Sequence, residues 1–175
     1  MPRRGTESKP AMKRYNIKVS FGRLYQHLED KFKEKAQLIT LRYDMSRRPP
    51  CKALAEAQRN DWRKSAKEHM GGEFTFIRAT AWDETEKGNP IHRFVVALDK
   101  DEAAALASSW TYGPTTVETV LPDKLEELAQ LLMGKCLENG EVAFPGERTW
   151  ATSWSVAGEA KRKEKQQQKS TTASA

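Results

Sequence analysis

The chain has 175 residues, of which 38% are hydrophobic and 31% are charged. This length suits one domain with a substantial core and is too short for two comfortable ones. No run approaches the roughly 18 apolar residues of a membrane-spanning helix, and no apolar stretch follows the basic start of the chain. The composition therefore excludes a membrane-spanning protein, and we expect a cytoplasmic protein without a secretory signal.

The net charge is +6, from 30 lysines and arginines against 24 acidic residues. A basic balance favours a polyanionic partner such as a nucleic acid, because phosphate binding releases condensed counterions without sequence-specific contacts. Part of the excess lies towards the two ends of the chain, where it is also compatible with a solubilising role. Cys51 and Cys136 lie far apart without CxxC spacing, which argues against a zinc knuckle and, in a reducing compartment, against a disulfide.

The first part of the chain is polar and basic before regular structure begins. Leu24, Leu28 and Phe32 then recur at helical spacing, and an apolar run follows that is ended by the breakers of 46–50. In chain order we expect a disordered segment over 1–14, a short strand over 15–22, an amphipathic helix over 23–35 and a buried strand over 37–43.

Apolar residues at helical spacing from Leu54 to Met70 predict a helix over 52–70, which Gly71 ends. The arginines and lysines between these apolar residues belong, on this pattern, to the solvated face of the helix. They include Arg59, Arg63 and Lys67.

Two strands over 73–82 and 91–98 flank an acidic turn and predict a β-hairpin. Alternate side chains of a strand share a face, so His92 and Phe94 lie on one side of the second strand and Arg93 on the other. The simplest interpretation of His92 is a sheet residue whose ring is satisfied by hydrogen bonds.

Asp99 and Glu102 form a capping box at the start of the next predicted helix, and Pro122 opens another that carries a leucine stripe. In chain order we expect a helix over 99–110, a strand over 115–120, a helix over 122–137 and a polar-aromatic segment over 146–155 that is a candidate for a final strand. The last residues form a polar tail that has no means to fold alone.

From residue 37 onward the predicted order is strand, helix, strand, strand, helix, strand, helix. This split βαβ order predicts an RRM-like α+β fold, with an antiparallel sheet and helices packed on one face. We expect one domain over 15–156 between disordered basic ends at 1–14 and 157–175. On the free face, Phe74, Phe76 and Phe94 are candidates for stacking on bases, with core packing as the alternative.

Several short segments, in order, resemble those of the HUH-type rolling-circle replication initiators (Rep proteins) of small plasmids and mobile elements. The similarity spans roughly residues 38–155. The segments are Leu38–Tyr43, similar to the family's opening FLTLTY strand; Glu73–Ile77, similar to the strand that leads to its metal site; Gly88–Leu98, at the place of its His-hydrophobic-His strand; Trp110-Thr111-Tyr112-Gly113, similar to W-x-Y-G; and Gly146–Ser153, similar to GKRxWxxS.

The resemblance implies a nuclease in which two strand histidines hold a divalent metal and a helix tyrosine attacks a phosphate. This chain has His92 at the first position, Phe94 at the second and no tyrosine after Tyr112. The resemblance therefore implies a degenerate member with a vestigial His92, no catalytic residue and no cofactor. An alternative keeps Mg²⁺ or Mn²⁺ on His92 with a carboxylate of the turn (Asp83, Glu84 or Glu86), and Tyr43 or Tyr112 as the nucleophile.

We expect a replication-initiator-like protein of a plasmid, phage or integrated element that binds single-stranded or hairpin DNA without cutting it. One alternative is a repurposed fold that binds a protein, such as an inhibitor of a host defence nuclease of the anti-CRISPR type. Another is a residual metal-dependent nicking endonuclease. The residues expected to meet phosphates are Arg42, Arg47, Arg48, Arg78, Arg93, Lys135 and Arg148.

Overall fold

The computed structural model of the protein describes residues 8–83, 89–134 and 150–154. The α-helices are α1 (Ser8–Phe32), α2 (Lys52–His69), α3 (Lys100–Ser108) and α4 (Leu125–Met133), with short 3-10 turns η1 (Met45–Arg47) and η2 (Pro122–Lys124). The strands are β1 (Gln37–Leu41), β2 (Phe76–Asp83), β3 (Asn89–Val96), β4 (Thr115–Thr119) and β5 (Trp150–Thr152). Over these residues, no helix is long and apolar enough to cross a membrane.

The strands form one antiparallel sheet in the order β4-β1-β3-β2-β5, with β3 at its centre. From β1 to α4 the order of elements is the predicted one, and the α+β antiparallel class is confirmed. The hairpin is confirmed as well, because β2 and β3 pair antiparallel from Phe76 with Val96 to Asp83 with Asn89. The segment over 146–155 contributes β5, which pairs with β2.

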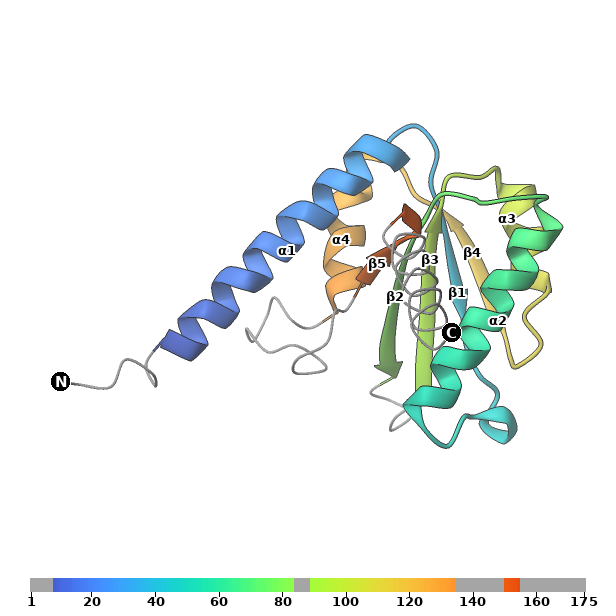
Figure 1. Ribbon diagram of the computed structural model, residues 1–175. Helices are drawn as coiled ribbons and strands as arrows, with labels where there is room; N and C mark the ends of the chain where they lie inside the picture. Colours follow the sequence, from blue (N-terminus) through green and yellow to red (C-terminus); the bar gives the residue numbers. More distant parts are fainter. Residues whose placement is uncertain (1–7, 84–88, 135–149, 155–175) are drawn as a thin grey trace, which may run out of the picture.

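Helices α2 and α3 cover one face of the sheet, as expected for the βαββαβ core (Figure 1). The alternate side chains Ile39 and Phe94, which face each other across β1 and β3, enter this core. Trp62 of α2 packs against Phe94 with ring centroids 4.8 Å apart, and its Nε1 donates to the carbonyl oxygen of Leu106 in α3. Phe74 and Phe76 are buried in the same core, so the three phenylalanines are packing residues and form no free platform for bases.

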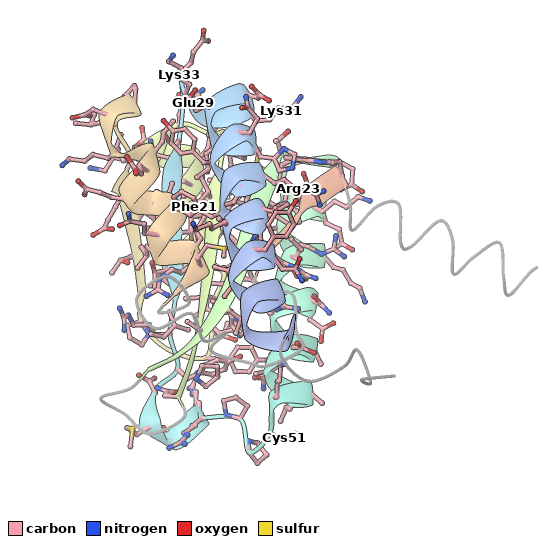
Figure 2. All side chains as sticks on the ribbon, turned by 90° about the vertical axis from the view of Figure 1, so that its left-hand side faces the viewer. Phe21, Arg23, Glu29, Lys31, Lys33 and Cys51 are labelled. Atoms are coloured by element: carbon pink, nitrogen blue, oxygen red, sulfur yellow. The ribbon has the colours of Figure 1, made fainter. Side chains whose placement is uncertain are left out.

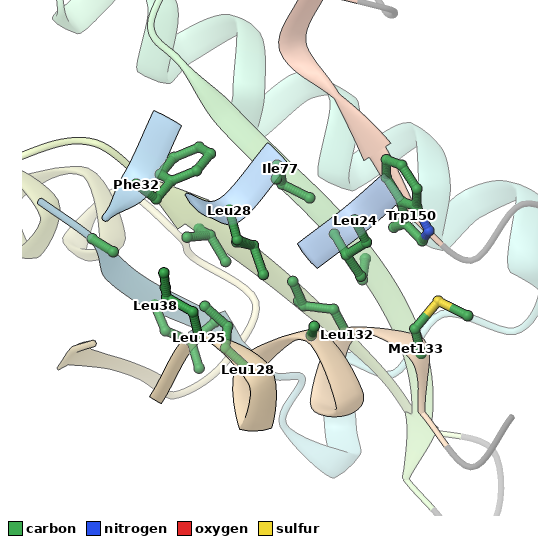
Figure 3. Close-up of a cluster of buried hydrophobic side chains, with 14 of the residues drawn as sticks. Leu24, Leu28, Phe32, Leu38, Ile77, Leu125, Leu128, Leu132, Met133 and Trp150 are labelled. Atoms are coloured by element: carbon green, nitrogen blue, oxygen red, sulfur yellow. The ribbon is translucent and has the colours of Figure 1, made fainter. Parts of the chain in front are cut away.

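The other face of the sheet is covered too, by α1 and α4, which differs from the expectation of helices on one face only. Leu28 of α1 and Leu128 of α4 meet Ile77 and Val95 of the sheet in a second core (Figure 3). The physical reason is that both sets of alternate side chains in β2 and β3 include large apolar residues. A sheet that is apolar on both faces needs a helical layer on each.

Helix α1 replaces the short strand that was expected over 15–22. The apolar positions Ile17, Phe21, Leu24, Leu28 and Phe32 recur every three or four residues, so the stripe that predicts a helix over 23–35 continues through the earlier segment. The helix begins at Ser8, inside the segment expected to be disordered. Figure 2 looks onto α1, with α4 beside it and the sheet behind both.

The segment Trp110–Gly113 anchors the start of β4 to the end of β1. The Nε1 of Trp110 donates to the carbonyl oxygen of Arg42 over 2.7 Å, and the amide of Asp44 donates to the carbonyl oxygen of Tyr112 over 2.9 Å. A Cβ at Gly113 would lie 2.5 Å from the Arg42 oxygen. This close approach of two backbones requires glycine.

Candidate functional site

His92 lies on β3 beneath α2, with none of its surface exposed. Its Nε2 is 3.1 Å from the hydroxyl of Tyr43, and its Nδ1 is 2.9 Å from the hydroxyl of Thr80. Burial lowers the pKa of His92 to about 3, and the charges of Arg59 and Arg78 act in the same direction. The interpretation of His92 as a hydrogen-bonded sheet residue is confirmed.

A chain of hydrogen bonds runs through His92. The hydroxyl of Tyr43 lies between Nε2 of His92 and the carbonyl oxygen of Ala55, 3.1 and 3.5 Å away. The Nδ1 of His92 bonds to the hydroxyl of Thr80, whose oxygen also accepts from Nη1 of Arg59 over 2.9 Å. Both ring nitrogens are therefore engaged, and neither offers a lone pair to a metal ion.

The other parts of the nuclease alternative do not gather around His92. Phe94, at the position of the second histidine, is buried against Trp62 and Phe76. Helix α4, which follows Tyr112 and contains no tyrosine, packs on the opposite face of the sheet from His92. Among the described residues, no group of three or more His, Cys, Asp or Glu side chains is arranged to hold a metal ion. Glu84 and Glu86 lie outside the described residues.

Tyr43, the first alternative nucleophile, is buried against Trp110, Tyr112 and the His92 ring. Burial raises the pKa of its phenol above the ordinary value of about 10. A buried, neutral phenol whose proton already bonds a carbonyl oxygen is a poor nucleophile. The half-buried Tyr112 packs edge-on against Trp110.

Arg59 corrects an expectation, because it lies on the buried side of α2 and not on its solvated face. Only 8% of its surface is exposed, its Nε is buried without an acceptor, and its Nη1 donates to Thr80. Burial lowers the pKa of its guanidinium, which nevertheless remains charged in proteins. Among the described residues, Arg59 forms no ion pair with a carboxylate.

Arg59, Arg63 and Arg78 form what we call the arginine cluster, at the interface of α2 and β2. Arg63 lies one turn after Arg59 and lowers the pKa of the Arg59 guanidinium, whereas the nearby carboxylate of Glu56 raises it more strongly. The Nε of Arg63 is buried without an acceptor. Arg78 of β2 donates to the side-chain oxygen of Asn60 over 2.8 Å. Three cations thus gather around the single nearby carboxylate that acts on Arg59, that of Glu56, and among the described residues neither Arg59 nor Arg63 forms an ion pair.

The sequence contains a signal for the buried position of Arg59. The buried residues of α2 are Ala55, Arg59, Trp62 and Ala66, spaced by four, three and four residues. This is the period of one helix face, and Arg59 stands on it between Ala55 and Trp62. The stripe was missed because an arginine in a helix is usually assigned to solvent.

The structure separates the other residues expected to meet phosphates. Arg93 pairs with Thr40, and its side chain lies on the face of the sheet opposite Arg78. Arg42 follows Thr40 by two residues, so it shares the face of Arg93. Arg47 and Arg48 are exposed at η1, where Arg47 donates to the carbonyl oxygen of Thr111. Lys135 and Arg148 lie outside the described residues. One surface therefore cannot include the whole predicted set.

Comparison of the chain with family models, with curated proteins and with solved structures found no match in any of the three.

Proposed function

We propose that this protein binds single-stranded or hairpin DNA through its phosphates and does not cut it, as a replication-initiator-like protein of a plasmid, phage or integrated element. The observation that carries the proposal is the arginine cluster. A charged guanidinium removed from water is costly unless an anion accepts its protons. Phosphate oxygens match the planar fork of a guanidinium. Among the described residues the buried Nε atoms of Arg59 and Arg63 have no acceptor, whereas Nη1 of Arg59 donates to Thr80.

Two further observations support binding without cleavage. Both nitrogens of His92 are engaged by Tyr43 and Thr80, so the imidazole would first have to break this hydrogen-bond chain to hold a metal. Helices cover both faces of the sheet, so bases cannot stack on the strands. DNA binding is therefore expected to use phosphate contacts from α2 and the loops.

The test compares Arg63→Gln with Lys64→Gln, which removes the same charge from the next position of α2. Lys64 is exposed and lies 3.8 Å from Asp61, outside the arginine cluster. The affinity for a labelled DNA hairpin is measured by fluorescence anisotropy over a range of salt concentrations in EDTA. We expect Arg63→Gln to weaken binding about tenfold and to lower the slope of log K against log salt by about 1, because one charged phosphate contact is lost.

Lys64→Gln is expected to change the affinity and the slope much less. Equal effects of the two variants would show that charge on α2 acts only through the long-range field, and would remove the cluster as the binding site. No binding to DNA at low salt would favour the protein-binding alternative, and metal-dependent nicking would favour the nuclease.

A further inference from the structure

A cavity of about 540 Å³ lies where the end of α1, the chain before β2 and the end of β5 meet. Its lining residues are His27, Lys31, Glu73, Phe74, Thr75, Ser153 and Trp154. In Figure 2, Lys31 lies near the end of α1, on the flank that faces β5. The volume is within the range of roughly 300 to 1,000 Å³ that is usual for small-molecule sites.

Aromatic rings line this cavity, and contacts between the rings hold them in place. His27 contacts both Trp150 and Trp154 edge-on, with ring centroids 5.8 and 5.2 Å apart. Trp150 is buried, whereas 40% of Trp154 is exposed. Phe74 is buried behind the cavity against Phe76. Trp154 thus offers an indole surface that is both held in place and accessible.

The polar groups of the cavity suit a ligand with hydrogen-bonding edges and a negative charge. The hydroxyl oxygen of Ser153 accepts the amide proton of Phe76 over 3.2 Å. Among the described residues its own proton has no acceptor and can be donated to a ligand. Glu73 forms an ion pair with Lys67, and both of these side chains are exposed. Among the described residues, Lys31 forms no ion pair, and its ammonium group is the positive charge in the cavity lining.

We propose that this cavity takes one unpaired base of a DNA single strand, stacked on Trp154, with a neighbouring phosphate at Lys31. A base combines a flat apolar face with acceptors on its edge, which are the two features that Trp154 and Ser153 recognise. The positive charge of Lys31 complements the phosphate beside that base. The inference rests on the proposed function, and adds to it a contact with bases that the arginine cluster cannot make.

The test separates bases from phosphates by comparing two oligonucleotides of equal length. One is oligothymidylate, and the other is an abasic strand with the same phosphates. We expect the wild-type chain to bind the thymidine strand about 5- to 150-fold more tightly than the abasic one, the range of base stacking on an aromatic side chain. Trp154→Ala should lose this factor on the thymidine strand and bind the abasic strand as the wild type does.

Two variants serve as controls. Tyr15→Ala removes another exposed aromatic ring, 65% exposed, from α1 and should leave both affinities unchanged. Lys31→Gln should lower the affinity for both strands by the same factor, because it removes a phosphate contact. Thermal unfolding of Trp154→Ala checks that the half-exposed position tolerates the change.

Equal wild-type affinity for the two strands, or equal losses on both in Trp154→Ala, would overturn the inference while leaving DNA binding intact. The cavity would then suit another occupant, such as an apolar side chain of a protein partner. Failure of the wild type to bind either strand would instead overturn the proposed function, and the inference with it.

Discussion

At the scale of single residues, the centre of the molecule combines a neutral histidine with a buried cation. Arg59 can only donate hydrogen bonds, and at the other end of the chain of bonds Tyr43 donates to Ala55. Between them, the two ring nitrogens of the neutral His92 form hydrogen bonds with Thr80 and Tyr43. The neutral state of His92 is therefore part of the folded structure, and its loss carries a cost in stability.

This cost makes the free energy of unfolding depend on pH through His92. The pKa of an unfolded histidine is about 6.5, whereas the folded value is about 3. As the pH falls below 6.5, the unfolded state takes up a proton that the folded state does not, so stability is lost down to about pH 3. Between pH 7 and pH 4 this contribution amounts to about 3 kcal/mol.

His92→Gln keeps a polar side chain in the strand and removes the titration. The free energy of unfolding of both proteins is measured with urea at pH 7 and pH 4. The pH dependence that comes from carboxylates is common to both proteins and cancels in their difference. We expect the stability advantage of the wild type to shrink by about 3 kcal/mol, or to reverse, at pH 4. A difference between the two proteins that does not change with pH would contradict the neutral, buried state of His92.

We predict that Arg59 lowers the free energy of unfolding and raises the affinity for DNA. Replacement of a buried charge by an apolar side chain of similar length is often neutral or stabilising. We expect Arg59→Met to raise the free energy of unfolding by about 1 kcal/mol and to weaken DNA binding at least tenfold. Urea unfolding and anisotropy on the same preparation check both. A marked loss of stability in Arg59→Met would indicate a structural arginine instead.

At the scale of elements, helical and strand periodicity predicted most of the fold from β1 to α4. The hairpin of β2 and β3 follows from two apolar runs around a short polar turn, and α3 begins where Asp99 and Glu102 form the capping box, the amide of Asp99 donating to Glu102 over 3.0 Å. Helix α1 was only half predicted, because a short window around Ile17 resembles a strand. Its helical stripe becomes evident only when it is followed to Phe32.

We predict that the packing of α1 on the sheet contributes strongly to the free energy of unfolding. Leu28 is fully buried between α1 and the sheet, so Leu28→Ala should lower the free energy of unfolding by about 3 kcal/mol. Arg23→Ala, on the exposed side of the same helix, should change it by less than about 0.5 kcal/mol. Urea unfolding checks both. Similar small effects would mean that this face of the sheet is open.

The junction of β1 and β4 gives a second test at this scale. Gly113→Ala forces a Cβ against the backbone of Arg42 and Asp44 and should cost about 3 kcal/mol. Gly22 lies in α1, where an added Cβ would meet no atom within 4 Å, so Gly22→Ala should stabilise the protein by up to about 1 kcal/mol. Opposite signs in thermal unfolding are the expected result, and a tolerated Gly113→Ala would contradict the close approach of the two strands.

At the scale of the whole molecule, sequence could place residues on a strand or helix but could not show which surfaces meet. Alternation correctly set His92 and Arg93 on opposite sides of β3. The register of β3 against its neighbours, which sets Arg78 and Arg93 on opposite faces, is a property of tertiary packing. For the same reason, the gathering of Arg59, Arg63 and Arg78 was not foreseen.

The most direct test of DNA binding by this chain is the affinity of the wild type for a single-stranded DNA hairpin, titrated over salt concentration in EDTA and again in Mn²⁺. We expect tight binding with a steep salt dependence and the same affinity in both conditions, because arginine–phosphate contacts need no metal. Binding or cleavage that requires Mn²⁺, or no binding even at low salt, would contradict the proposal that the protein binds DNA without a metal and does not cut it.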